Sequence, residues 1–191
     1  MTLTTEAVSR LIRRCLREGH TLEIEGLGSV RIGTDGHYEL TADLRPRIFI
    51  AYAVEERKLA ERLAEGLERA GLDAWLDRRK LMPGQNWRRA IAQAIEVSDY
   101  FVACFSRHSV AKRGGFQREL RLALETAEGV PLDRTFLIPF RLDVCDPPRE
   151  FAARAQWVDA FPDFDRGVAS VIATIRRQER RRVLKDRKVV D

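Results

Sequence analysis

Short apolar runs alternate with longer stretches of helical periodicity over most of this chain. Residues 48–52 are apolar without alternation, which is typical of a strand covered on both faces of a sheet. Comparable runs follow at residues 72–76, 100–105, 135–140 and 156–158. Between most of these runs, apolar residues recur every three or four positions, which predicts amphipathic helices between the strands. This order predicts parallel pairing, and hence an α/β, doubly wound sheet of about five parallel strands.

The loops that follow these strands are the expected place for a functional site. In doubly wound sheets, ligands bind beyond the carboxyl ends of the strands. Here those ends lead into residues 52–56, 77–85 and 106–119. The last segment contains a basic, glycine-containing loop at residues 107–115.

The first 43 residues follow a different pattern, and we expect them to form a small helix-plus-β-hairpin element. Apolar residues at helical spacing run from Val8 to Leu16, and Gly19 ends this pattern. Alternation between positions 22 and 40 predicts a small antiparallel ribbon. Residues 17–31 resemble the helix and first hairpin of HU-type DNA-binding proteins, without the long arms that grip DNA. We therefore expect an appendage for packing or dimerisation, with DNA contact as the alternative.

The composition supports one domain of ordinary size with this appendage. The chain has 191 residues, of which 45% are hydrophobic, enough for a real core. The formal net charge of +5 does not by itself indicate nucleic-acid binding, because much of the excess lies at residues 176–188. The expected divisions are the N-terminal element at 1–43, the main domain at 44–178 and a basic tail at 179–191.

Several classes of protein are excluded by what the sequence lacks. Cys15, Cys104 and Cys145 are far apart and odd in number, so neither a disulfide framework nor a metal site is expected. Ser106 and His108 have no third residue placed to orient the histidine, which argues against a Ser–His nucleophile. No G-x-x-x-x-G-K-[ST] phosphate loop occurs. Without a signal sequence or an apolar run of about 20 residues, we expect a soluble, cytoplasmic protein with no membrane contact.

Four segments of the main domain carry distinctive sequences in a fixed order. They are Phe49-Ile50-Ala51-Tyr52 with Glu55-Glu56-Arg57, Trp75-Leu76-Asp77 with Leu81-Met82-Pro83-Gly84 and Trp87, Ser106 with residues 113–120, and residues 136–148. In this order they resemble the sequence boxes of TIR (Toll/interleukin-1 receptor-like) domains, in their bacterial branch, over about residues 46–178. The resemblance implies a flavodoxin-like fold, and it identifies residues 78–85 as the BB loop of the family.

The resemblance implies two kinds of function. Many bacterial and plant TIR domains cleave NAD⁺ at the nicotinamide–ribose bond, some cyclise the ADP-ribose product, and bacterial examples often serve in antiphage defence. Nicotinamide leaves as a neutral group, so the chemistry needs mainly a carboxylate near the oxocarbenium-like charge. We therefore expect an NAD⁺ hydrolase that acts as a homo-oligomer, takes NAD⁺ as substrate and needs no cofactor. The alternative is a non-catalytic interaction module, and in either case a sensor or effector protein is a possible partner.

The resemblance also implies roles for particular residues. Glu119 becomes the catalytic carboxylate, hydrogen-bonded to ribose hydroxyls, and the BB loop joins protomers. The residues expected to bind substrate are Tyr52, Ala53, Glu55, Arg57, Asp77 and Phe116, and those of the interaction loop are Leu81, Met82, Pro83, Gly84 and Trp87.

Each of the main residues also has a purely structural interpretation. Glu119 fits a helix-surface glutamate near a helix N-terminus, where its charge is favourable. Tyr52 fits a strand-end residue packed on the next helix, and Trp87 fits a core anchor. Glu55 and Arg57 fit the first turn of a helix.

Three residues depart from the pattern of the family. Ala51 and Ala53 stand where serines are common, and Gly115 stands where many members have a tryptophan before the glutamate. A ring stacked on the substrate must then come from elsewhere, and Phe116 is the candidate that the sequence offers.

Overall fold

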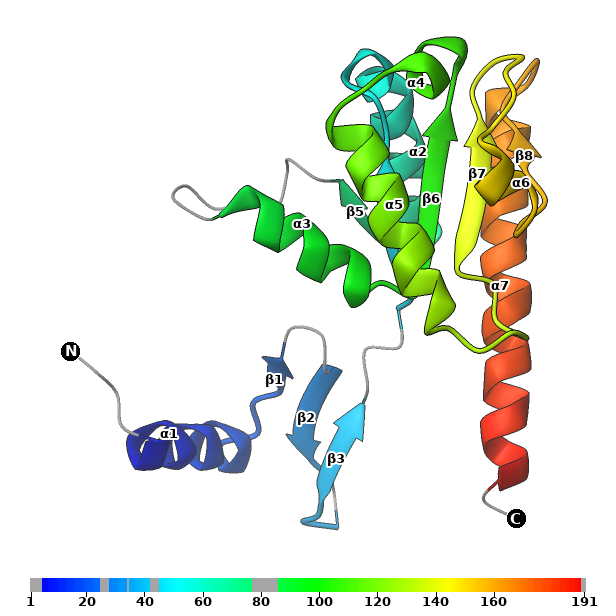
Figure 1. Ribbon diagram of the computed structural model, residues 1–191. Coiled ribbons are helices and arrows are strands. Elements are labelled where there is room, and N and C mark those ends of the chain that lie inside the picture. Colours follow the sequence, from blue (N-terminus) through cyan, green and yellow to red (C-terminus); the bar gives the residue numbers. More distant parts are fainter. Residues whose placement is uncertain (1–4, 25–27, 34, 42–44, 77–85, 190–191) are drawn as a thin grey trace. The chain divides into compact units, whose positions relative to one another are not determined.

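The computed structural model describes residues 5–24, 28–33, 35–41, 45–76 and 86–189 (Figure 1). The chain divides into two compact units, Met1–Arg45 and Pro46–Asp191. Among the described residues, no helix combines the length and hydrophobicity that crossing a bilayer requires.

The N-terminal unit is a helix followed by a three-stranded antiparallel sheet. Helix α1 (Thr5–Arg17) contacts strands β1 (Leu22–Ile24) and β2 (Gly28–Ile32), and β3 (Tyr38–Thr41) pairs with β2. The predicted helix and antiparallel ribbon are therefore present.

A five-stranded parallel sheet forms the centre of the second unit, as the sequence predicted. Its order is β5 (Asp73–Leu76), β4 (Arg47–Ala51), β6 (Tyr100–Phe105), β7 (Leu137–Arg141) and β8 (Val158–Asp159). Each neighbouring pair is parallel. The fold is thus α/β and doubly wound, with β4 and β6 on either side of the point where the winding reverses.

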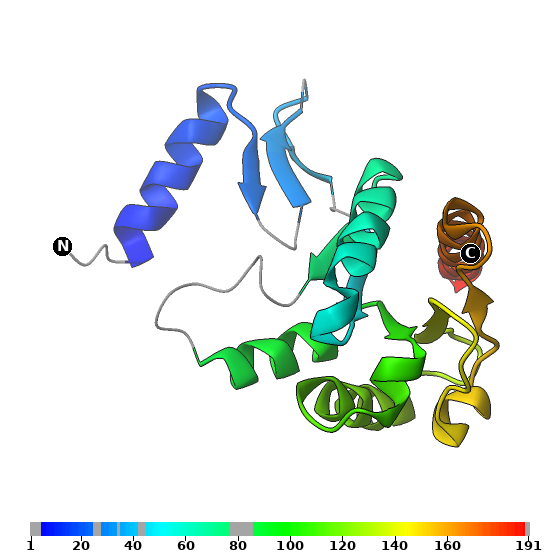
Figure 2. The same ribbon diagram turned by 90° about the horizontal axis from the view of Figure 1, so that it is seen from above.

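Alternate residues of the strands build two cores, one on each face of the sheet. Ile48 and Ile50 belong to the core that includes residues of helices α2 (Arg57–Arg69) and α7 (Phe164–Val189). Phe49 and Ala51 belong to the other core, with residues of α3 (Trp87–Glu96) and α5 (Gly115–Glu128). Figure 2 shows this layering, with α2 and α7 on one side of the strands and α3 and α5 on the other. Because helices cover both faces of the sheet, the sequences of its strands are largely unbroken runs of apolar residues.

Some segments differ from the sequence-based expectation. The last helix runs into the basic tail, as expected, and α7 continues from Phe164 to Val189, whereas the unit boundary falls after Arg45. The expected loop at 107–115 contains a short helix, α4 (Arg107–Ala111). The short helices η1 (Val54–Glu56) and α6 (Arg149–Ala152) were not predicted as separate elements.

Candidate active site

A cavity of about 570 Å³ lies where the connections after β4 and β6 meet the first turns of α3 and α5. This volume is within the range of small-molecule sites. The lining residues are Tyr52, Ala53, Val54, Arg57, Trp87, Ile91, Lys112, Arg113, Gly115, Phe116 and Glu119. The cavity therefore occupies the carboxyl edge of the sheet, at the reversal of the winding, where doubly wound folds bind ligands.

Glu119 is the buried carboxylate of this cavity. Its residue is 9% exposed, although it lies only four positions after the start of α5. It shares the buried face of the helix with Phe116, Leu120 and Ala123. The position near a helix N-terminus agrees with the structural interpretation of Glu119, whereas the burial does not fit a residue on the helix surface. A glutamate side chain buried in the wall of a cavity is a candidate for a specific use in ligand binding.

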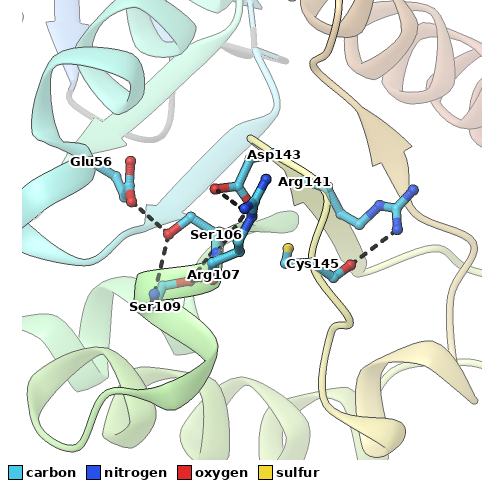
Figure 3. A network of polar contacts seen from close by, with 7 residues as sticks. All are labelled: Glu56, Ser106, Arg107, Ser109, Arg141, Asp143 and Cys145. Carbon is cyan, nitrogen blue, oxygen red and sulfur yellow. Dashed lines mark hydrogen bonds and ion pairs between the residues drawn. The ribbon is translucent and has the colours of Figure 1, made fainter.

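A pair of buried serines fixes the start of α4 beside the cavity. The Ser106 hydroxyl accepts a hydrogen bond from the Ser109 amide (3.1 Å), and the Ser109 hydroxyl accepts one from the Ser106 amide (2.7 Å). This reciprocal capping box satisfies two backbone donors at once. The Ser106 hydroxyl also donates to Glu56 Oε1 at 2.5 Å (Figure 3). This contact ties η1, which follows β4, to the helix that follows β6.

Three cationic side chains line the cavity. Lys112 donates a hydrogen bond to Glu55, and this bond lowers the pKa of the Glu55 carboxyl. Arg57 forms a hydrogen-bonded ion pair with Glu61, at 3.0 Å between Nε and Oε1. Arg113 is exposed and has no hydrogen bond or ion pair to any other residue in the described ranges. Its guanidinium is the cation best placed to meet an anionic ligand.

The loop after β7 is held by a second polar network, which does not line the cavity. The Arg107 amide donates to Asp143 Oδ1 at 3.0 Å, and Arg141 donates to the Cys145 carbonyl at 3.0 Å (Figure 3). Burial raises the pKa of the Cys145 thiol to about 11. Within the described ranges, no three His, Cys, Asp or Glu side chains converge as a metal ion would require.

Trp87 is not the core anchor that the sequence suggested. Asn86 caps α3 by accepting a hydrogen bond from the Arg89 amide (3.3 Å), so Trp87 is the first helical residue. Along the face of α3, the exposed fraction is 47% at Trp87, 7% at Ile91 and 0% at Ile95. This face therefore leaves the core toward the helix N-terminus and turns into the cavity wall.

Phe116 lines the cavity, but most of its side chain is buried in the core. It is 6% exposed, and its ring meets Phe105 edge-on, with centroids 5.8 Å apart and planes at 72°. Tyr52 is partly buried and packs against the core on the α2 and α7 side. Gly115 leaves open space in the wall, because a Cβ atom there would meet nothing within 4 Å.

The structure brings most of the expected site residues together, and it adds others. Tyr52, Ala53, Arg57, Phe116 and Glu119 line the cavity, whereas Glu55 does not line it but accepts a hydrogen bond from Lys112, which does. Sequence reasoning missed the lining residues Val54, Ile91, Lys112 and Arg113, although Lys112 and Arg113 belong to the basic loop that it had placed at this edge. Asp77, Leu81, Met82, Pro83 and Gly84 lie outside the described residues.

The family assignment follows from comparison with known proteins. The family model of the TIR domain matches residues 48–172, which is most of the second unit. This chain belongs to the TIR domain family. The matched region contains all the cavity-lining residues and, apart from Arg47 at the start of β4, all five strands of the parallel sheet.

Sequence and structure comparisons also find individual proteins that are similar to this chain. The uncharacterized protein y4cD of Sinorhizobium fredii is 31% identical over 117 residues, which cover 61% of this chain and 18% of that protein. The TIR domain of the Toll-related receptor TRR-2 of Hydra magnipapillata is 25% identical, with a TM-score of 0.52, covering 66% of this chain and 97% of the receptor domain. The TIR domains of the activated Roq1 resistosome are 18% identical, with a TM-score of 0.53, and the match covers 69% of this chain and 98% of the resistosome chain. These two structures share the fold of the second unit.

Proposed function

We propose that this TIR protein hydrolyses NAD⁺ at the nicotinamide–ribose bond, as a self-assembled enzyme of antiphage defence. The observation that carries the proposal is the Glu119 carboxylate, buried in the wall of a cavity at the carboxyl edge of the sheet. Membership of the TIR family supports it, since the family includes NAD⁺-cleaving enzymes.

The proposed chemistry uses Glu119 as the carboxylate beside the reacting ribose. The bond between the ribose C1′ and the nicotinamide nitrogen breaks, and its electron pair neutralises the cationic ring, so no proton is needed by the leaving group. Positive charge then develops on the ribose, where a buried carboxylate stabilises it more strongly than water would. Water adds to C1′ and loses a proton, giving ADP-ribose; attack by an adenine nitrogen of the same molecule would give a cyclic product instead.

The cationic side chains of the cavity suit the diphosphate of this substrate. Arg57 and Lys112 already face the carboxylates of Glu61 and Glu55, so their charges are partly offset. Arg113 keeps its full charge, and a guanidinium can donate two parallel hydrogen bonds to a phosphate. The site thus pairs one buried carboxylate for the ribose with a positive rim for the phosphates.

The test is nicotinamide release from NAD⁺ by the purified 191-residue chain over a wide range of protein concentration. We expect Glu119→Gln to lower the rate by about 100-fold or more, because the charge that stabilises the transition state is removed. Glu125→Gln is the matched control, since Glu125 is exposed on the same helix. It should leave the rate unchanged.

The concentration series tests self-assembly as well as catalysis. If a site is completed by a neighbouring protomer, release rises faster than linearly with protein concentration. No release at any concentration, even with a crowding agent that drives assembly, would contradict the proposal. It would favour the second candidate, a non-catalytic TIR module that acts through protein–protein contacts.

A further inference from the structure

Trp87 is a large aromatic residue whose position in the cavity is not explained by packing. It is 47% exposed at the start of α3, while Ile91, one turn further on, is 7% exposed. Leaving about half of an indole ring in contact with water forgoes much of the free energy that its burial would provide. The cavity is the concave surface that this ring lines.

The other tryptophans of the chain are engaged elsewhere. Trp75 stacks on Phe49, with ring centroids 4.8 Å apart, and Trp157 lies under the Arg141 guanidinium at 4.7 Å. Neither of them lines the cavity. Trp87 is thus the tryptophan that the described part of the cavity presents to a ligand.

The other aromatic residues of the cavity are less available for stacking. Phe116 is 6% exposed and packs against Phe105, and Tyr52 is partly buried against the opposite core. The Arg88 guanidinium lies over the Trp87 ring, at 5.3 Å from the ring centroid. Because Trp87 lines the cavity, a second planar group can approach its ring from there.

We infer that Trp87 is the stacking platform for a planar, cationic heteroaromatic ring, which is the nicotinamide ring if the proposed function holds. The indole face carries a negative quadrupole and attracts a cationic ring. Apolar Ile91 and Phe116 line the same cavity and suit the uncharged nicotinamide that cleavage leaves. Trp87 supplies from α3 the ring that is lacking at Gly115 on α5.

This role makes a specific kinetic prediction. Stacking on the cationic ring acts in the bound substrate and is weakened as the charge moves to the ribose, so it contributes to binding more than to the chemical step. We expect Trp87→Ala to raise KM about ten-fold or more, the size typical of base stacking, with kcat unchanged or raised. Trp87→Phe keeps an aromatic face and should have a smaller effect.

Binding can be measured apart from turnover with the Glu119→Gln chain and NAD⁺. Stacking on an indole quenches its fluorescence, so NAD⁺ should quench part of the tryptophan emission. The quench should persist in a Trp157→Phe background and vanish with Trp87→Phe. NADH, whose nicotinamide ring is neutral and not aromatic, should bind at least several-fold more weakly.

The outcomes separate this inference from the proposed function. Quenching that requires Trp87 without any nicotinamide release would sustain the inference and end the proposal of hydrolysis. Glu119-dependent release with an unchanged KM in Trp87→Ala would sustain the proposal of hydrolysis and overturn the inference about Trp87. Absence of a Trp87-dependent quench with NAD⁺ would also overturn the inference. Circular dichroism of each variant checks that the fold is intact.

Discussion

Two adjacent glycines at the start of α5 have opposite backbone requirements. Gly114, the N-cap, has φ 135° and ψ −146°, a conformation that is nearly restricted to glycine. Gly115 is the first helical residue, and a Cβ there would meet nothing within 4 Å. We expect Gly115→Ala to raise the free energy of unfolding by about 0.4–1 kcal/mol, because the unfolded chain loses freedom. Gly114→Ala should lower it by about 1–3 kcal/mol through strain.

Urea denaturation of both variants checks this pair, and each serves as the control for the other. If both variants changed the free energy of unfolding in the same direction, the assigned start of α5 would be contradicted. Since Gly115 lines the cavity, its replacement by alanine also tests whether one added methyl group affects substrate binding.

The exposure of Trp87 shows why part of the site could not be predicted from the sequence. Trp87, Ile91 and Ile95 follow the helical spacing of a buried face, and periodicity alone cannot tell where that face leaves the core. The position of α3 against the sheet decides where its apolar face leaves the core. In this position, the first turn of α3 lines the cavity. Glu119 was predicted through its sequence box, whereas its burial follows from the packing of α5.

At the scale of elements, the capping box of α4 joins two loops of the site. We expect Ser106→Ala to lower the free energy of unfolding by about 1–2 kcal/mol, since the helix loses its N-cap and η1 loses its bond to α4. Ser170→Ala is the control, because this exposed hydroxyl bonds only the Arg166 carbonyl of its own helix at 2.9 Å. If Ser106→Ala lowered the free energy of unfolding by no more than Ser170→Ala does, the role of Ser106 in joining the two loops would be contradicted.

The sequence does not reveal α4 because its signal is weak. The common capping box has glutamate or glutamine three residues after the cap, and here Ser109 takes that place. The strands, in contrast, were predicted because a sheet covered on both faces requires unbroken apolar runs. Lys112 and Arg113 were assigned only to a basic loop, since their contribution to the cavity depends on where α4 ends.

At the scale of the whole molecule, the parallel sheet has its buried cores within the second unit. The described members of both core clusters of the parallel sheet lie between Ile48 and Ile175, within the second unit. The N-terminal unit, residues 1–45, consists of a helix and a three-stranded sheet. A unit of this size is marginal as an independent domain.

A chain that begins at Pro46 should therefore keep the fold of the second unit. We expect its thermal midpoint, measured by circular dichroism, to lie within about 2 °C of the value for the 191-residue chain, which corresponds to less than about 1 kcal/mol. A larger drop would show that the N-terminal unit stabilises the sheet. Nicotinamide release by both chains at matched concentrations completes the test. Because the cavity-lining residues all lie in the second unit, a rate that falls only at low concentration would mean that residues 1–45 act through assembly.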